Sequence, residues 1–217
     1  MMNFDFLKEK IHNGTFIVVD FETVTPAGRP PEPMELAALT VKPNLIVDSV
    51  NVFNSLMRLP EGVFLTSFDV NQTGILQKDV DNASSQIEVF ERFEQFLPEG
   101  VFLFVAQNAN YEASILNRFK ETCLKSSKAI FIDTIKIGKY LYPNLPNYKL
   151  NTLSSFLEIP IPVNRHRALP DVVITAKIFI KMVEHGVKEG KVNLIQDLIR
   201  IGKIADKTNN DNQLSLF

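Results

Sequence analysis

The sequence predicts an α/β protein in which a mixed sheet carries helices on its faces. Three strand-like segments open the chain with short connections between them, which is typical of an antiparallel meander. Helix-like and strand-like segments then alternate, which indicates helices packed on a sheet. The chain has 217 residues, of which 45% are hydrophobic and 22% are charged. These values are ordinary for a globular protein and are sufficient for one domain with a substantial core.

The predicted strands are short apolar runs. The expected meander consists of residues 15–21, 34–41 and 47–57, and the third of these alternates only in part. Residues 101–106 (VFLFVA) are wholly apolar and are therefore expected to form a central strand. Residues 129–133 are expected to form the last strand.

The predicted helices have apolar residues at helical spacing. In the first of them, residues 84–97, Ser85 and Glu88 have the spacing of a capping box. Pro170 is expected in the first turn of a long helix through residues 171–185, and Gly186 is expected to end it. The other expected helices are residues 111–124, 134–141, 150–157 and the amphipathic segment 192–205.

The composition predicts one domain, residues 1–205, followed by a flexible tail, residues 206–217, that begins with the polar tract DKTNNDN. The single Cys123 excludes an internal disulfide and fits a reducing compartment. The chain shows neither a signal peptide nor an apolar run of the roughly 18 residues that a membrane span requires. The sequence therefore predicts a cytoplasmic protein that does not associate with a membrane. Its formal net charge of -2 gives no sign of nucleic-acid binding, although an enzyme that meets phosphate through metal ions can be acidic.

Two carboxylates interrupt the first strand-like run, IVVDFETVTP at residues 17–26. A buried, unpaired charge is costly, so either the strand ends in solvent at this point or Asp20 and Glu22 bind a cation. Residues two apart on a strand point to the same face. Paired carboxylates on one face form an oxygen site suited to Mg²⁺ or Mn²⁺.

His166 precedes Asp171 by five residues. Asp171 lies close to a predicted helix start, where the helix dipole favours an anion. Histidine is well suited to accept a proton from water near neutral pH. The alternative is that His166 is a surface loop residue beside Arg165 and Arg167.

Three segments of the chain resemble the three motifs of the DEDDh 3′→5′ exonuclease family, in the order that the family has. They are VVDFETVTP (18–26), FVAQNANYEASIL (104–116) and HRALPDVVITAKIF (166–179). With the segments between them, the resemblance covers nearly all of residues 15–185. It implies a ribonuclease H-like fold, a mixed five-stranded sheet flanked by helices.

The resemblance assigns metal binding to Asp20, Glu22 and Asp171, and the role of general base to His166. The family has an aspartate in its second motif where this chain has Glu112. Glu112 is therefore expected to be the fourth metal ligand, with a carboxylate that reaches about 1 Å further than that of an aspartate. The alternative is that Glu112 is simply an exposed residue early in a helix.

The same motifs supply the candidates for contact with the substrate, which are Phe21, Thr23, Asn108 and Tyr111. Thr23 follows the first pair of acids and is expected to touch the terminal nucleotide. Tyr111 could stack on a base, or could pack within the domain. Phe21 lies between the two acids and points to the opposite face, which favours a place in the core.

The family's activity implies hydrolysis of the 3′-terminal phosphodiester with two Mg²⁺ or Mn²⁺ ions about 3.5 to 4 Å apart, releasing nucleoside 5′-monophosphates. The leading hypothesis is a DNA exonuclease that acts in replication proofreading or repair, with a DNA polymerase as a potential partner. One alternative is an exoribonuclease or oligoribonuclease, whose site must accept a 2′-hydroxyl. Another is a nucleic-acid-binding or clamp adaptor module in which Glu112 weakens the chemistry.

The end of the chain places apolar residues after a polar tract. Gln213, Leu214, Leu216 and Phe217 resemble the short peptide by which bacterial polymerases and repair enzymes bind the sliding clamp. On a flexible tether, such a peptide would raise the effective concentration of the enzyme at DNA. This resemblance favours DNA over RNA as substrate, while the alternative is that the tail folds back on its own domain.

Overall fold

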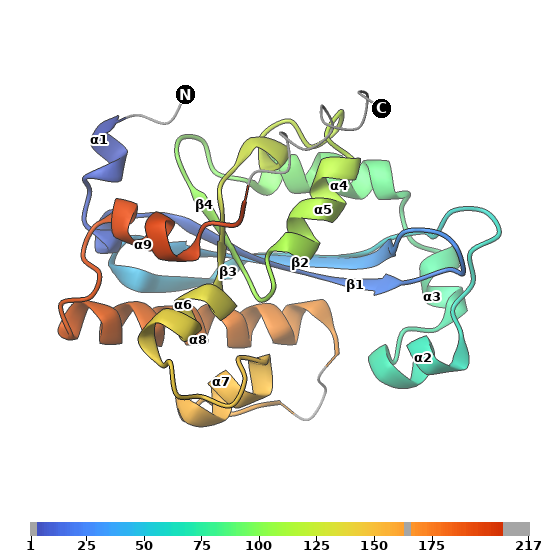
Figure 1. Ribbon diagram of the computed structural model, residues 1–217. Helices are drawn as coiled ribbons and strands as arrows, with labels where there is room; N and C mark the ends of the chain where they lie inside the picture. Colours follow the sequence, from blue (N-terminus) through green and yellow to red (C-terminus); the bar gives the residue numbers. More distant parts are fainter. Residues whose placement is uncertain (1–3, 163–165, 206–217) are drawn as a thin grey trace, which may run out of the picture.

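The structure, a computed structural model, describes residues 4–162 and 166–205. A five-stranded sheet in the order β3-β2-β1-β4-β5 forms its centre (Figure 1). The antiparallel part consists of β1 (Phe16–Val24), β2 (Glu32–Lys42) and β3 (Ile46–Leu56). Strands β4 (Leu103–Ala106) and β5 (Phe131–Asp133) continue the sheet in parallel with β1. The predicted meander and the mixed five-stranded sheet are confirmed; β4 is an interior strand, and β1 is the middle one.

Helices cover both faces of the sheet (Figure 1). One face carries the long helix α8 (Ala168–Lys188) together with α6 (Thr134–Leu141) and α7 (Leu150–Phe156). The other face carries α4 (Gln86–Phe96) and α5 (Asn110–Arg118). Near the ends of the chain are α1 (Phe4–Leu7) and α9 (Ile195–Gly202), and short 3-10 helices span Ile11–Asn13, Pro43–Leu45 and Ser126–Lys128.

The middle strand alternates its side chains between two apolar clusters. Phe16 and Val18 pack in the cluster that contains the buried residues of α8. Ile17, Val19 and Phe21 pack in the cluster that contains the buried residues of α4. The alternation of a strand therefore places the next side chains of the first set, those of residues 20 and 22, on the face that carries α8.

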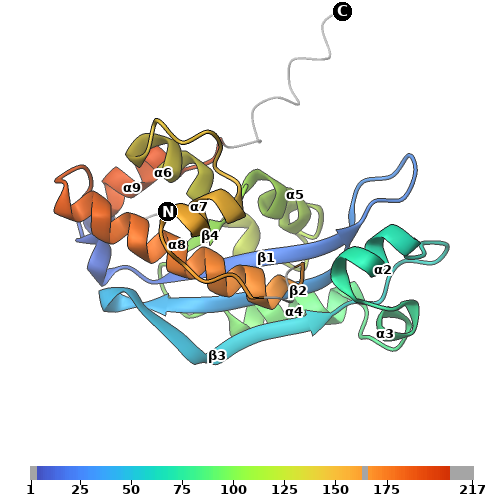
Figure 2. The same cartoon turned by 90° about the horizontal axis from the view of Figure 1, so that it is seen from below.

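A small lobe, which the sequence analysis did not resolve into elements, lies at the end of the sheet where β1 ends and β2 begins (Figure 2). It consists of α2 (Ser67–Thr73) and α3 (Gln77–Asp81). A third apolar cluster, which includes Val24, Met34 and Ile75, joins the lobe to the sheet. Each of the two helices is too short to show the periodicity from which helices are predicted.

The predicted start of α4 is confirmed. The side chain of Ser85 accepts a hydrogen bond from the backbone N–H of Glu88 at 3.3 Å, and Glu88 Oε2 accepts one from the Ser85 N–H at 2.8 Å. The end predicted for α5 is wrong, because the helix stops at Arg118 instead of residue 124. At that point Phe119 packs against Phe90 with ring centroids 4.4 Å apart, a tertiary contact that a local sequence pattern does not contain.

Pro170 lies in the first turn of α8, as predicted, but Gly186 does not end this helix. A Cβ atom at residue 186 would approach Val192 Cγ2 to 2.6 Å, so Gly186 serves close packing inside the helix. The helix ends at Lys188, and Gly190 adopts the left-handed backbone conformation (φ +64) that commonly follows a helix end. The final predicted helix, by contrast, is shorter than expected, at Ile195–Gly202 instead of residues 192–205.

Cys123 is fully buried, and burial raises the pKa of its thiol to about 12. Within the described residues, no helix has the length and apolar character that crossing a bilayer requires. The predicted tail, residues 206–217, lies outside the described residues.

Candidate functional site

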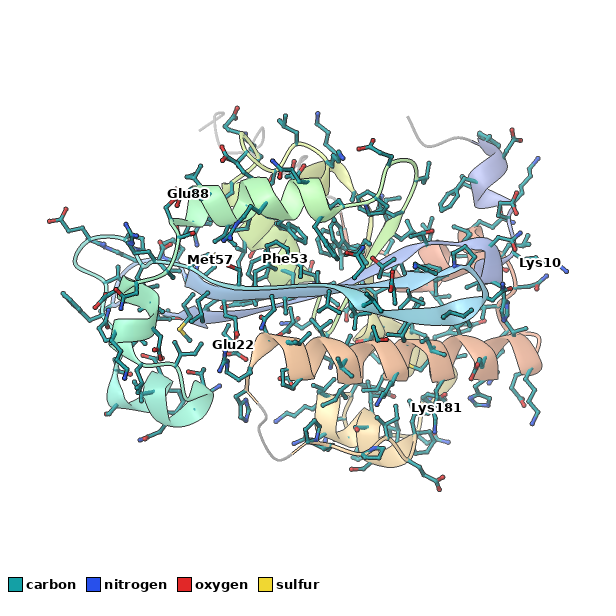
Figure 3. All side chains as sticks on the ribbon, turned by 180° about the vertical axis from the view of Figure 1, so that it is seen from behind. Lys10, Glu22, Phe53, Met57, Glu88 and Lys181 are labelled. Atoms are coloured by element: carbon teal, nitrogen blue, oxygen red, sulfur yellow. The ribbon has the colours of Figure 1, made fainter. Side chains whose placement is uncertain are left out.

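Three of the predicted metal ligands meet at one place. Asp20 and Glu22 extend from β1 on the face that carries α8, and Asp171 extends from the first turn of α8. One carboxylate oxygen of each residue lies within 4.8 Å of the corresponding oxygens of the other two. Figure 3 shows Glu22 on this side of the sheet, beside the start of α8. Residues about 150 positions apart in the sequence thus form one acidic cluster, which we call the carboxylate triad.

The triad has the electrostatic character of a cation site. Burial, followed by the negative charges of Glu112, Glu22 and Asp171, raises the pKa of Asp20 well above its ordinary value. Like charges at this spacing disfavour ionisation unless positive charge is supplied. Carboxylate oxygens are the ligands that Mg²⁺ and Mn²⁺ prefer, so the donor set of the triad fits such an ion.

Glu112 lies next to the triad but is not one of its three members. Its side chain, on the first turn of α5, is 3% exposed, so the alternative of an exposed helix residue is wrong. Burial and, to a smaller extent, the charge of Asp133 raise the pKa of Glu112 well above its ordinary value. A hydrogen bond from the backbone lowers this pKa but does not offset the effect of burial. No hydrogen-bond donor among the described residues reaches its buried Oε2 atom. A bound cation would satisfy this oxygen.

Asp133, at the end of β5, holds the turn from which α5 starts. Its Oδ1 atom accepts hydrogen bonds from the backbone N–H of Asn108 at 3.2 Å and of Ile135 at 2.9 Å. Asn108 itself has a left-handed backbone (φ 66) and an exposed side chain. Asp133 was not among the predicted site residues, although an acid directly after the apolar residues Phe131 and Ile132 is the same signal that marked Asp20.

Two of the candidate substrate contacts bind each other. Thr23 Oγ1 and the hydroxyl oxygen of Tyr111 lie 2.5 Å apart. Phe21, by contrast, is 6% exposed and lies with its ring centroid 6.1 Å from that of Phe90, on the face that carries α4. The core place expected for Phe21 is confirmed, and the structure does not bring this side chain to the triad, so its inclusion among the substrate contacts is not supported.

His166 lies two residues before α8, with an exposed side chain and a left-handed backbone (φ 68). The residues before it, 163–165, fall outside the described part of the chain, and they include Arg165, which was expected beside His166. The five-residue separation from Asp171 puts His166 and a triad member on the same short stretch of backbone.

A partly buried ion pair, which was not predicted from the sequence, lies beside the triad. The side chain of Glu35, on β2, is 1% exposed and binds the guanidinium of Arg167. A sequence signal existed, because Glu35 interrupts an otherwise apolar run just as Asp20 does. Arg167 gave no such signal, since it follows His166 in a polar loop.

The chain is similar in sequence to parts of much longer proteins. It is 34% identical over 171 residues to the DNA polymerase III PolC-type of Caldanaerobacter subterraneus subsp. tengcongensis, an alignment that covers 79% of this chain and 12% of the relative. The Bacillus subtilis DNA polymerase III PolC-type is 30% identical over 178 residues, an alignment that covers 81% of this chain and, again, 12% of the relative. The chain thus spans about an eighth of the length of these curated relatives.

The fold is similar to that of solved nuclease structures. The nuclease domain of 3'hExo, a DEDDh family member bound to rAMP, superimposes with a TM-score of 0.69 at 18% identity, covering 82% of this chain and 96% of that one. At these identities the similarity establishes the fold, and it confirms the predicted class. A family model described as Exonuclease matches residues 17–179, which include the carboxylate triad, Glu112 and His166. This chain therefore belongs to the exonuclease family of nucleases.

Proposed function

We propose that this protein is a metal-dependent 3′→5′ exonuclease that hydrolyses the terminal phosphodiester bond of DNA and releases nucleoside 5′-monophosphates. The observation that carries the proposal is the carboxylate triad, in which oxygens of Asp20, Glu22 and Asp171 lie within 4.8 Å of one another. Membership of the exonuclease family supplies the reaction class. The direction of digestion rests on the resemblance of the motifs to those of DEDDh enzymes.

The triad would hold Mg²⁺ or Mn²⁺, and Glu112 would complete the ligand set for a second ion with its otherwise unsatisfied Oε2 atom. Ions bound there would polarise the scissile phosphate and stabilise the charge that develops on the leaving 3′ oxygen. The protein's own contribution is placement: β1 supplies two ligands from a packed strand, and α8 and α5 supply one each. Carboxylates held on such elements keep their spacing better than carboxylates on loops.

His166 is proposed to accept the proton of the attacking water. Its side chain is exposed two residues before α8, so solvent water can reach it. General-base catalysis by a placed histidine contributes about 10²- to 10⁴-fold to a rate. His166 and Asp171 lie on the same short stretch of backbone, so a shift of this stretch would move the proposed base and a metal ligand together.

DNA is the proposed substrate, since the sequence relatives are DNA polymerases III. The structural neighbours include structures with either kind of nucleic acid: 3'hExo was solved with rAMP, and E. coli Exonuclease I was solved with a dT13 oligonucleotide. Exonuclease I superimposes with a TM-score of 0.66 at 15% identity, covering 82% of this chain and 42% of that one. An exoribonuclease or oligoribonuclease is therefore the second candidate, favoured by the bound rAMP of the first neighbour.

Replication proofreading or repair is the proposed setting, with a DNA polymerase and a bacterial sliding clamp as partners in the cytoplasm. The relatives named above support the polymerase connection. Clamp binding is proposed from the sequence of Gln213, Leu214, Leu216 and Phe217, which lie outside the described residues. Deleting residues 213–217 is expected to abolish capture by immobilised clamp while leaving cleavage of short oligonucleotides unchanged. Undiminished capture would refute the clamp proposal.

The experiment that tests the activity uses single-stranded DNA and RNA of the same sequence, each labelled at its 5′ end, with Mg²⁺ or Mn²⁺. The expected result is a ladder of shortened DNA products that retain the label, with slower shortening of the RNA. Immediate release of the label as a mononucleotide would reverse the proposed direction. Faster cleavage of RNA would favour the second candidate, and no cleavage of either substrate with either ion would leave only the adaptor interpretation.

A further inference from the structure

An ion pair between the buried Glu35 and the partly exposed Arg167 joins strand β2 to the start of helix α8. The guanidinium of Arg167 contacts both oxygens of Glu35: Nη2 lies 2.6 Å from Oε1, and Nε lies 2.9 Å from Oε2. Glu35 Oε2 also accepts the backbone N–H of Ala168 at 3.0 Å. Arg167 is the N-cap residue of α8, and its own side chain does not cap the helix. The carboxylate of a neighbouring strand thus takes the place of a local cap.

The ion pair lies next to the carboxylate triad. Glu35 is paired with Glu22 in the β1–β2 register. Residues directly opposite in an antiparallel pair have their side chains on the same face, so Glu35 and Glu22 share the face that carries α8. The anchored residues 167 and 168 precede Asp171 by about one helical turn, and they follow His166 immediately. The pair therefore holds the one backbone segment that carries both a triad member and the proposed base.

The Glu35–Arg167 ion pair opposes the electrostatic repulsion within the triad. Bringing the N-terminus of α8 toward β1 places Asp171 beside Asp20 and Glu22, and the three negative charges repel one another in the absence of a cation. The Glu35–Arg167 pair supplies attraction between the N-terminus of α8 and β2, the strand that is paired with β1. The hydrogen bond that Arg167 donates to Glu35 is the main factor that raises the pKa of Arg167, and the charge of Glu22 adds to it, so the guanidinium stays positive next to the triad.

We infer that Glu35 and Arg167 are positioning residues, whose ion pair holds the start of α8 against the sheet so that the triad is assembled before metal binds. This inference rests on the proposed function, because it concerns the same site. A second ion pair of the same kind offers a matched comparison: Arg118, at the end of α5, binds Glu32, also on β2, with Nη2 and Oε2 2.9 Å apart. Arg118 lies on the helix of Glu112, but nearly two turns beyond it.

The test compares Mn²⁺ binding by isothermal titration calorimetry in the wild-type protein and in Arg167→Gln, Glu35→Gln and Arg118→Gln. Loss of a residue that orients a metal ligand typically weakens metal binding about 10- to 100-fold. We expect a loss of this size for the first two variants and a change of less than about twofold for Arg118→Gln, with part of the loss recovered in Arg167→Lys. Mn²⁺ affinity within about twofold of wild type in Arg167→Gln would overturn the inference.

A double variant separates positioning from stability. Glu35 is buried and the Arg167 side chain is 37% exposed. Replacing both partners of an ion pair by apolar residues of similar size often costs little stability, so Glu35→Met/Arg167→Met is expected to melt close to the wild-type temperature. It is nevertheless expected to bind Mn²⁺ about tenfold or more weakly. A folded double variant with wild-type Mn²⁺ affinity would show that the pair serves stability alone. Because calorimetry requires no substrate, absence of nucleic-acid cleavage by the wild-type protein would refute the proposed function without deciding this comparison.

Discussion

The hydroxyl oxygens of Thr23 and Tyr111 lie 2.5 Å apart and join strand β1 to helix α5. Thr23 directly follows Glu22, and Tyr111 directly precedes Glu112. The bond therefore connects the two chain segments that supply carboxylates from different sides of the site. Together with Asp133, which holds the turn before α5, it limits how far Glu112 can move from the triad.

Tyr111→Phe removes this connection and keeps the ring. Loss of one hydrogen bond is expected to lower the free energy of unfolding by about 1 kcal/mol. Cleavage is expected to fall by about tenfold, because Glu112 is then held less well. Denaturant melts and single-turnover cleavage measure the two effects. Tyr140→Phe, at a residue that is 42% exposed, is the control. Equal behaviour of the two variants would show that the bond does not support the site.

Asp20→Asn is expected to stabilise the metal-free protein while abolishing cleavage. Because the pKa of Asp20 is raised in the folded protein, its ionised form lowers stability at all pH values above the ordinary carboxyl range. Asparagine removes that charge with little change in shape. Thermal melts with and without Mn²⁺ test this: the variant should melt higher than wild type without metal and gain less from Mn²⁺. Cleavage at the wild-type rate would remove Asp20 from the proposed chemistry.

Metal binding is expected to release protons. The pKa values of Asp20 and Glu112 are both raised, so each carboxyl retains a proton to a higher pH than usual in the absence of a cation. A cation that binds the ionised form must displace these protons. Mn²⁺ affinity should therefore rise with pH, and the number of protons released per ion should fall as pH rises. Calorimetry in buffers of different ionisation enthalpy measures this number. Affinity independent of pH would contradict a proton-linked site.

Glu112→Gln tests whether the fourth acid takes part in the chemistry. Removing a buried charge next to Asp133 and Asp20 is expected to raise the melting temperature of the metal-free protein. Cleavage is expected to drop by about tenfold or more, because a ligand charge is lost. Glu112→Asp, which restores the residue usual in the family's second motif, should keep cleavage within about tenfold of wild type. Undiminished cleavage by Glu112→Gln would reduce this residue to a packing role in α5.

His166→Ala is expected to lower cleavage by about 10²- to 10⁴-fold without weakening Mn²⁺ binding. Because the side chain is exposed, added imidazole has access to the space that it leaves and should restore part of the rate. The matched control is His12→Ala, in the 3-10 helix before β1, which should cleave normally. Wild-type cleavage by His166→Ala, or equal loss in the control, would argue against a base at this position.

Local signals in the sequence predicted what depends on nearby residues. The capping box of Ser85 and Glu88 places the start of α4, and the two-residue spacing places Asp20 and Glu22 on one face of β1. That these acids meet Asp171 could be predicted only from the family resemblance, because their meeting depends on how α8 crosses the sheet.

Features that depend on tertiary contacts were missed. The early end of α5 coincides with the packing of Phe119 on Phe90, and the close approach of Val192 explains why a glycine lies inside α8 at position 186. The pair of Glu35 and Arg167 joins residues more than a hundred positions apart. A short sequence window does not show which distant residues are in contact. The charge of Glu35 within an apolar run was a local signal, but it does not identify Arg167 as the partner.

The inert state of Cys123 has a practical consequence for spectroscopy. This thiol is fully buried and its pKa is raised to about 12, so it offers almost no thiolate to an alkylating reagent at neutral pH. A cysteine introduced at an exposed position such as Val50, which is 94% exposed on the edge strand β3, would react with a maleimide dye far faster. Site-selective fluorophores or spin labels can therefore be attached to the native background, with no need to remove the natural thiol first.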